Sequence, residues 1–225
     1  MLSKFKKFSP LFLITLTVLS RFVGISWGDG FFFHPDENNM ARSISDMKPD
    51  LNPHFFAYGQ FPLYLSYFLI NYLKLPQTFS VAVFSLRFFS AIFSCLTILV
   101  FHQLSLIFFK PKQAYLFILL LILSPGLIQI SKFGTTESLL VLVFGTLIYL
   151  SLRFYQSKKL IYLFAASITL GIGIATKISS LIFITPVLLS LFFSQLKFKK
   201  TVLYLLFFLI FTLILTIIFS PYNLI

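Results

Sequence analysis

The chain has 225 residues, of which 58% are hydrophobic, and its 18 Lys and Arg against six Asp and Glu give a net charge of +12. Several apolar runs approach or exceed the roughly 20 residues that cross a hydrocarbon core, and they are apolar on every face instead of alternating as barrel strands do. This composition excludes a soluble globular domain and a membrane β-barrel, and it predicts an all-α, polytopic membrane helix bundle.

The basic residues lie mostly as pairs and triplets between the apolar runs, which is typical of cytoplasmic loops and argues against nucleic acid as a partner. The single cysteine, Cys95, lies inside an apolar run, so a disulfide within the chain is impossible. The sequence has neither a Gly-rich phosphate loop nor a zinc pattern of spaced histidines. We therefore expect no metal site and no cofactor, although two adjacent carboxylates can bind a divalent ion.

The first apolar run, about residues 8–28, follows three lysines near the amino terminus. It is longer than the apolar part of a usual signal peptide, contains Arg21 and lacks a small-x-small cleavage site. We interpret it as an uncleaved first membrane helix, in which Arg21 needs a helix end or a loop acid as its partner.

A long loop, about residues 29–78, follows and holds all but one of the six acids of the chain. Residues 34–47 are predicted to form a short amphipathic helix, because Pro35 suits the first helical position and acids suit the first turn. Its apolar residues recur at helical spacing: Met40, Ile44 and Met47. We expect this stripe to lie on the membrane.

The later part of the loop, residues 61–75, is apolar enough to be mistaken for a crossing, and the placement of charge decides the choice. If it does not cross, eleven of the eighteen basic residues fall on one side; if it crosses, eight of them move to the other, against the positive-inside bias. We therefore predict that it lies in or dips into the outer interface. The amino terminus is then cytoplasmic, and all six acids lie on the extracytoplasmic face.

Six further apolar runs are each predicted to be a membrane helix, which makes seven joined by short loops. Their predicted spans are residues 79–109, 113–131, 136–153, 160–176, 178–196 and 201–219. Pro125 and Pro186 fall inside two of them, where a kink is tolerated because neighbouring helices can satisfy the freed backbone groups. We predict a single transmembrane module over residues 1–225.

Asp36 and Glu37 are the candidate catalytic residues, because carboxylates are costly near a bilayer and those retained there are candidates for a function. A carboxylate at the outer surface can take a proton from an acceptor hydroxyl or amine as it attacks an activated carbon. The alternative is stabilisation of a helix start by two first-turn acids, worth only about 0.3–1 kcal/mol each. The scarcity of other acids favours the functional interpretation.

Basic residues predicted on the same side are candidates for binding a phosphate: Arg87, Lys177 and Arg42. Arg offers a bidentate fork and Lys a point charge, and the alternative is snorkelling at helix ends. Four further residues could line a sugar or acceptor pocket: His54, Tyr58, Gln60 and Glu137. Interfacial Tyr and His are common in any case, and Glu137 is either an ordinary first-turn acid or the partner of a basic residue.

The phrase His34-Pro35-Asp36-Glu37 after a first helix resembles the GT-C superfamily of integral-membrane glycosyltransferases, nearest its protein O-mannosyltransferase and aminoarabinose-transferase group. Shorter similarities follow in order at residues 60–64, 85–91, 136–140 and 175–177. The chain departs from the family's Lys-Pro-Pro-Leu-Tyr segment, since Gln60 replaces its Lys and Phe61 its first Pro. The chain therefore lacks the family's lysine, and with it a lysine contact to phosphate, at this point of the loop.

The resemblance implies a transferase that takes a sugar from a polyprenyl-phosphate donor and passes it to a lipid, glycan or protein acceptor. It makes Asp36 the base, with Glu37 beside it, and Arg87 a contact to the lipid-linked phosphate. Arg42 or Lys177 would compensate for the missing lysine. It also implies that relatives continue past the seventh helix, so we expect an amino-terminal membrane module from a bacterial or archaeal plasma membrane.

Two alternatives of other classes stay open. A transporter or lipid-carrier flippase would need ionisable groups near mid-membrane and repeated, broken helices. A non-catalytic relative of the enzyme fold would keep the helices without the activity. Consumption of a polyprenyl-phosphate sugar separates the three.

Overall fold

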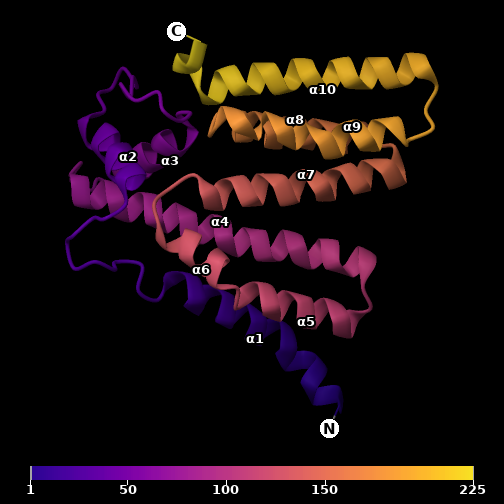
Figure 1. Ribbon diagram of the computed structural model, residues 1–225, viewed down its shortest axis with the longest axis horizontal. Helices are drawn as coiled ribbons and strands as arrows, with labels where there is room; N and C mark the ends of the chain where they lie inside the picture. Colours follow the sequence, from indigo (N-terminus) through magenta and orange to yellow (C-terminus); the bar gives the residue numbers. More distant parts are fainter. Residues whose placement is uncertain (1, 225) are drawn as a thin grey trace.

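The computed structural model describes residues 2–224, apart from the side chains of residues 2–9, 223 and 224, and all of its regular elements are helical (Figure 1). In chain order they are α1 (Leu2–Phe22), α2 (Pro35–Asp46), α3 (Phe61–Tyr72), α4 (Phe79–Phe108), α5 (Pro111–Ile122), α6 (Pro125–Lys132), α7 (Glu137–Ser157), α8 (Leu160–Ile174), η1 (Ile178–Ile184), α9 (Thr185–Phe192), α10 (Phe198–Phe219) and η2 (Pro221–Leu224). The all-α prediction is confirmed over this range. The lysines predicted to be cytoplasmic at the amino terminus, Lys4, Lys6 and Lys7, lie outside the described side chains.

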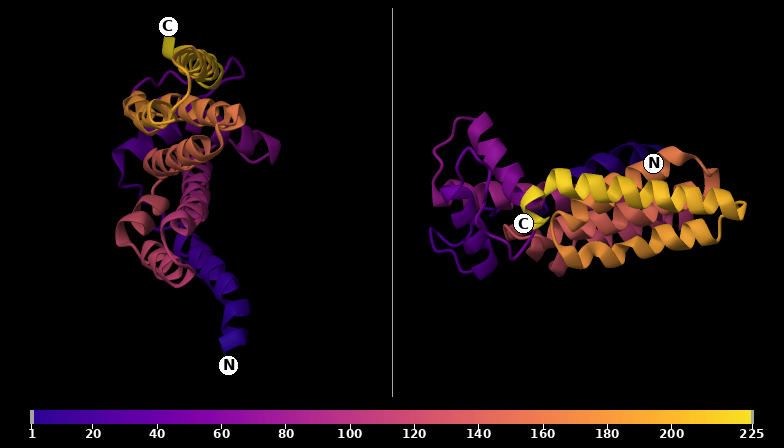
Figure 2. Two further views of the ribbon diagram at one scale, coloured as in Figure 1. Left: turned by 90° about the vertical axis from the view of Figure 1, so that its right-hand side faces the viewer. Right: turned by 90° about the horizontal axis from the view of Figure 1, so that it is seen from above.

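The apolar helices lie side by side and alternate in direction, with α4 at the centre of the bundle (Figure 1). α4 packs against α1, α5 and α6 on one side and against α7 on the other, and α7, α8 and α10 then follow in order. Figure 2 shows that α2, α3 and the loops around them gather at one end of this bundle. That end is where the candidate residues of the long loop lie.

Every predicted span coincides with a helix or a broken helix, but not all are long enough to cross a membrane by themselves. Within residues 2–224, α4, α7 and α10 meet the length and hydropathy of a crossing, and α5 with α6 makes a fourth. α1, α8 and the pair η1 and α9 contribute shorter apolar stretches. The chain is therefore an integral membrane protein with three or four helices of full crossing length, and seven crossings remain a prediction.

Both prolines predicted to kink a span stand at a break. α5 and α6 meet at 48°, and Pro125 is the first residue of α6. Pro186 lies at the start of α9, after the 3-10 turns of η1. A proline lacks the backbone N–H that an internal helical position needs, so it is best accommodated where a new helix begins.

The stripe predicted to lie on the membrane faces the protein instead. Met40, Ile44 and Met47 are all buried, in a cluster with apolar side chains of α3 and α4 such as Leu63 and Val83. This prediction was wrong because helical spacing reveals an apolar face but not what covers it, and here α3 and α4 supply the cover. The cluster attaches α2 firmly to the end of the bundle.

Arg21, deep in α1, has a helix end as its partner. Its guanidinium donates to the backbone oxygens of Ile122 and Leu121, at the end of α5, and to Ser94 Oγ. The last carbonyls of a helix lack partners within it and carry partial negative charge, so they suit a buried cation. A charge inside an apolar helix is thus satisfied without any carboxylate.

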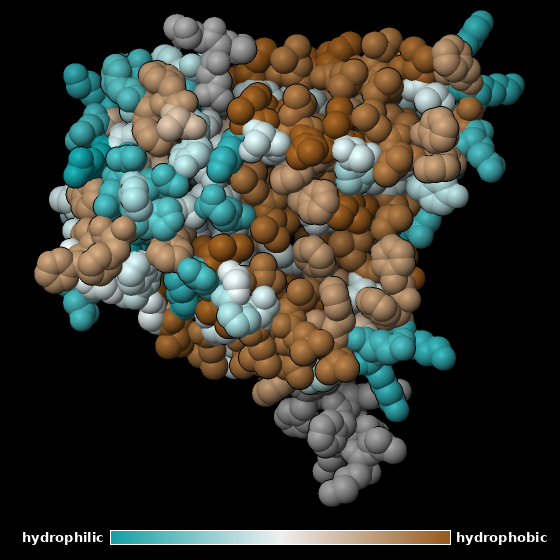
Figure 3. Space-filling model, viewed as in Figure 1, coloured by the Kyte–Doolittle hydropathy of each residue, from teal (hydrophilic) through white to brown (hydrophobic). Residues whose placement is uncertain are grey.

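The space-filling view shows an apolar middle with hydrophilic side chains at both ends of the bundle (Figure 3). Eight basic residues lie in the turns at the end away from α2 or in the helix ends beside them: Lys110, Lys112, Arg153, Lys158, Lys159, Lys197, Lys199 and Lys200. All six acids lie at or near the other end, in the loop around α2 and at the start of α7. The two ends therefore differ sharply in charge.

Candidate active site

Asp36 and Glu37 occupy the first turn of α2, after His34 at the position that precedes the helix and Pro35 at its first residue. Successive residues of an α-helix point about 100° apart, so two adjacent carboxylates cannot share one environment. Glu37 turns inward and is 0% exposed, whereas Asp36 is only half-buried. The local structure separates the two candidate acids into different surroundings.

Glu37 lies in a buried ion pair with Arg87, eight residues into α4. Glu37 Oε1 accepts from Arg87 Nε at 2.8 Å and from the backbone N–H of Gly134 at 2.6 Å, and Oε2 accepts from Arg87 Nη2 at 2.7 Å. Both side chains are nearly inaccessible, at 0% and 2%. This bidentate pair joins α2, α4 and the α6–α7 loop at one point.

Arg87 also anchors the segment that leads from α1 into the loop. Its Nη1 donates to the backbone oxygens of Ile25 at 3.2 Å and Trp27 at 2.9 Å, and its guanidinium lies 4.6 Å from the centre of the Trp27 ring. Nε, Nη1 and Nη2 thus all have protein partners. A contact of Arg87 to a donor phosphate stays a prediction, and the geometry found is that of an anchor.

Gly134 is a residue that the sequence analysis did not select. A Cβ at this position would lie 2.6 Å from Leu86 Cβ and 3.0 Å from Glu37 Oε1, so a side chain would push the loop away from the ion pair. The absence of a side chain lets the backbone N–H reach Glu37. The only signal in the sequence is a glycine just before the start of α7.

Three candidates from distant segments, Tyr58, Lys177 and Glu137, lie close to one another, and Tyr58 is also within interaction range of Asp36. Lys177 Nζ is 4.9 Å from the centre of the Tyr58 ring and 3.8 Å from Glu137 Oε1. The side chains of Lys177 and Glu137 are 34% and 42% exposed. Asp36, Tyr58, Lys177 and Glu137 therefore form a partly open cluster of charges, here called the outer cluster.

Tyr58 connects Asp36 to this cluster. Burial, a hydrogen bond to Asp36, and the negative charges of Asp36 and Glu137 together raise the pKa of Tyr58 to about 12. The phenol is therefore protonated throughout the physiological range, and a protonated hydroxyl beside a carboxylate is able to donate to it.

The loop before α3 is held against the end of α8, which brings Tyr58 to Lys177. The backbone N–H groups of Gly59 and Phe61 donate to the carbonyl oxygens of Thr176 and Ala175, at 3.0 and 3.1 Å. A Cβ on Gly59 would lie 2.0 Å from the Ala175 oxygen, so the backbones approach as closely as they do only because residue 59 is glycine.

The remaining candidates lie outside the outer cluster. Gln60 is buried, and its Oε1 accepts from the Tyr64 hydroxyl at 3.2 Å and from the Tyr222 backbone at 3.0 Å. His54 and Arg42 are exposed on the loop and on α2. Substrate roles for these three stay predictions, and Gln60 visibly ties the loop to the segment after α10.

The part of the chain that the structure describes holds no group of three His, Cys, Asp or Glu side chains arranged to bind a metal ion. The outer cluster offers instead one carboxylate beside a protonated phenol, one ammonium and a second carboxylate. These groups can accept a proton and neutralise an anion beside each other.

Comparison with known proteins connects this geometry to a family. The sequence pattern of the family described as dolichyl-phosphate-mannose-protein mannosyltransferase matches residues 62–219 of this chain. Among solved structures, the protein O-mannosyltransferase Pmt1-Pmt2 complex of S. cerevisiae bound to the sugar donor is similar with a TM-score of 0.70 at 17% identity. The similarity covers 95% of this chain and 33% of that one, so this chain spans about a third of its length. Comparison with curated proteins gives no match.

Proposed function

The chain belongs to the dolichyl-phosphate-mannose-protein mannosyltransferase family, and from this premise we propose that it transfers a sugar from a polyprenyl-phosphate carrier to an acceptor at the extracytoplasmic face of the membrane. The observation that carries the proposal is the outer cluster, a partly open site in which Asp36 lies beside Tyr58, and Lys177 lies between Tyr58 and Glu137. A lipid, glycan or protein hydroxyl can serve as the acceptor.

In the proposed reaction, Asp36 takes the proton of the acceptor hydroxyl as its oxygen attacks the anomeric carbon of the sugar. The bond between that carbon and the phosphate oxygen breaks with inversion, and the lipid phosphate departs with the bonding electrons. Lys177, 34% exposed and only 3.8 Å from Glu137, can turn toward the departing phosphate and neutralise its charge. Tyr58 keeps the Asp36 carboxylate oriented for the proton.

Glu37 and Arg87 have a positioning role in this proposal. Their buried pair fixes the start of α2 against α4, and with it the direction in which the adjacent Asp36 points. The Arg87 guanidinium is 2% exposed and already bonded to Glu37, Ile25 and Trp27, so contact with the donor phosphate would require this end of the bundle to open. Lys177 is therefore the better placed of the two for the phosphate.

We further propose seven crossings, with the basic end of the bundle in the cytoplasm and the outer cluster outside. Helices in alternating directions and basic turns at one end support this orientation. α1, α8 and η1 with α9 then complete the count with shorter apolar stretches, which suit a bundle that packs them against longer neighbours.

The test uses Asp36→Asn in the full-length protein, with Asp46→Asn as a matched control, because Asp46 is the exposed last residue of the same helix. Loss of the base should lower the transfer rate by about 10²–10⁴-fold, while the control retains activity. The measurement is the release of polyprenyl phosphate from polyprenyl-phosphate mannose in membranes that contain the protein. Undiminished transfer by Asp36→Asn would show that Asp36 is not the general base.

The same assay separates the other two classes of function. A flippase would move the donor lipid between leaflets of a vesicle without consuming it. A non-catalytic relative would do neither, with the unaltered chain as well as with the variant. Either outcome contradicts the transferase proposal.

A further inference from the structure

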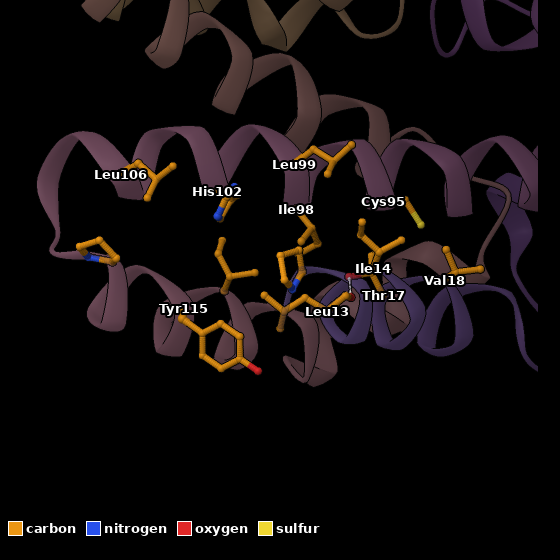
Figure 4. A pocket seen from close by; sticks show the side chains of 13 residues that line it. Leu13, Ile14, Thr17, Val18, Cys95, Ile98, Leu99, His102, Leu106 and Tyr115 are labelled. Carbon is orange, nitrogen blue, oxygen red and sulfur yellow. Dashed lines mark hydrogen bonds between the residues drawn. The ribbon is translucent and has the colours of Figure 1, made fainter. Parts of the chain in front are cut away.

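Two crevices open between helices in the half of the bundle nearest the basic end. The first, of about 430 Å³, lies between α1, α4 and α5 (Figure 4). Its lining is largely apolar, with Ile98 and Leu106 among its residues, and the hydroxyl of Thr17 already donates to the Leu13 oxygen at 2.7 Å. Nothing in this lining selects one occupant over another.

The second crevice, of about 480 Å³, lies between α7 and α9 and differs in kind. Ile148, Leu152 and Leu189 form its apolar wall, Ser151 lies among them on α7, and Tyr155 and Gln195 add polar groups toward the basic end. A crevice with an apolar wall and a polar end suits a ligand that has an apolar part and a polar part, and in a membrane such a ligand is a lipid.

Ser151 is the first independent indication of a ligand. Its side chain is 4% exposed and lines the crevice, yet its hydroxyl has no hydrogen-bond partner. Ser190 on the opposite wall is satisfied by its own helix, through the Val187 oxygen at 2.8 Å. A buried hydroxyl left without a partner is costly, and an oxygen of a bound molecule would satisfy it.

The charge at the mouth is the second indication. Lys158 Nζ lies 4.3 Å from the centre of the Tyr155 ring, which lines the crevice, and Lys159 follows it in the same turn. Exposed Lys197 follows two residues after Gln195, which lines the crevice from the α9 side. The acid of this helix, Glu137, begins α7, roughly 30 Å away at 1.5 Å per residue. The mouth is thus cationic without compensating acids.

We propose that the crevice between α7 and α9 binds an anionic phospholipid, with an acyl chain along Ile148, Leu152 and Leu189 and the head-group phosphate at Lys158. Ser151 would donate to an ester oxygen at the boundary between chain and head group. This lipid site goes beyond the sugar transfer proposed above. It depends only on the proposed orientation of the bundle in the membrane, which places the basic end in the leaflet that carries anionic lipids.

The experiment is native mass spectrometry of the purified chain titrated with dioleoyl phosphatidylglycerol or with dioleoyl phosphatidylcholine. The unaltered chain should retain phosphatidylglycerol preferentially. Lys158→Gln should weaken that binding about fivefold, the contribution of one lysine near an anionic lipid. Leu189→Trp, which fills the crevice from its exposed side, should abolish the preference.

Matched controls separate binding from general damage. Lys74→Gln changes another lysine with positive φ, at the opposite end of the bundle, and Leu213→Trp changes an exposed leucine of α10 outside the crevice. Both should bind phosphatidylglycerol as the unaltered chain does. Equal retention of the two lipids, or losses in the controls that match those in the variants, overturns the proposal.

Displacement of phosphatidylglycerol by polyprenyl phosphate at equal concentration would also overturn it, since the crevice would then belong to the carrier. Sugar transfer is not measured in any of these arms. An inactive chain that still prefers phosphatidylglycerol refutes only the proposed function, and an active chain without the preference refutes only the lipid site.

Discussion

The two ends of the bundle use charge in opposite ways. At the end that carries α2, acids and bases from segments far apart in the chain pair with one another, some of them completely buried. At the other end, basic side chains stand on three turns with solvent around most of them and no acid nearby. Paired, buried charges hold specific segments of the chain together, whereas unpaired, exposed charges contribute only to the electrostatic potential around the protein.

This difference tells which substitutions should matter. Removal of a buried, paired charge at the α2 end, such as that of Arg87, leaves its partner without compensation inside the protein. A charge removed from the basic end leaves only water and lipid head groups to adjust. The predictions below test this contrast, beginning with the largest expected effect.

Arg87→Met should destabilise the protein by about 3–5 kcal/mol, because it leaves the buried Glu37 carboxylate without its cation. The control at the basic end is Lys197→Met, at an exposed residue, which should change stability by less than about 0.5 kcal/mol. Thermal unfolding in detergent measures both. The double variant Glu37→Gln with Arg87→Met should recover part of the loss; equal small effects at both ends would break the comparison.

Gly134→Ala should cost about 1–3 kcal/mol, because the new Cβ would meet Leu86 and the Glu37 carboxylate. Gly126→Ala is the matched control, since a Cβ there has open space, and it should leave stability unchanged or slightly higher. The same unfolding measurement compares them. A loss of stability at Gly126 as large as that at Gly134 would mean that the loss at Gly134 does not come from its close contacts with Leu86 and Glu37.

Tyr58→Phe should lower the rate of transfer by up to about tenfold, because it removes the hydroxyl beside Asp36 and keeps the ring beside Lys177. Tyr72→Phe, at an 85% exposed residue, should have no effect. The expected loss lies in kcat, since a misoriented base affects the chemical step more than binding. Unchanged kcat in Tyr58→Phe would remove Tyr58 from the site.

Tyr58 should also give the protein a pH dependence. Its pKa is raised to about 12 in the folded state from an ordinary value of about 10, so the folded state keeps a proton that the unfolded state releases. The resulting stability is complete below pH 10 and declines as the pH rises toward 12. The thermal midpoint of Tyr58→Phe should therefore fall less between pH 10 and 11 than that of the unaltered chain.

The helices and the placement of acids could be predicted from residues alone. Hydrophobic runs, Pro35 at a helix start and Glu137 at the start of α7 are local signals, and each appears where it was expected. The distribution of basic residues likewise predicted that residues 61–75 do not cross the membrane. The helix found there, α3, has 12 residues and is too short to cross it. These features depend on neighbours within a few turns.

Which residues meet was decided by packing. Arg87 and Glu37 are 50 residues apart, and Gly134 reaches Glu37 across 97, so no local pattern relates them. The stripe of Met40, Ile44 and Met47 was predicted to meet lipid for the same reason, because its spacing says nothing about α3 and α4. The sequence by itself determined helices, their order and the separation of charge; only the tertiary structure paired the charges, because the free energy of a buried carboxylate depends on which cation the fold places beside it.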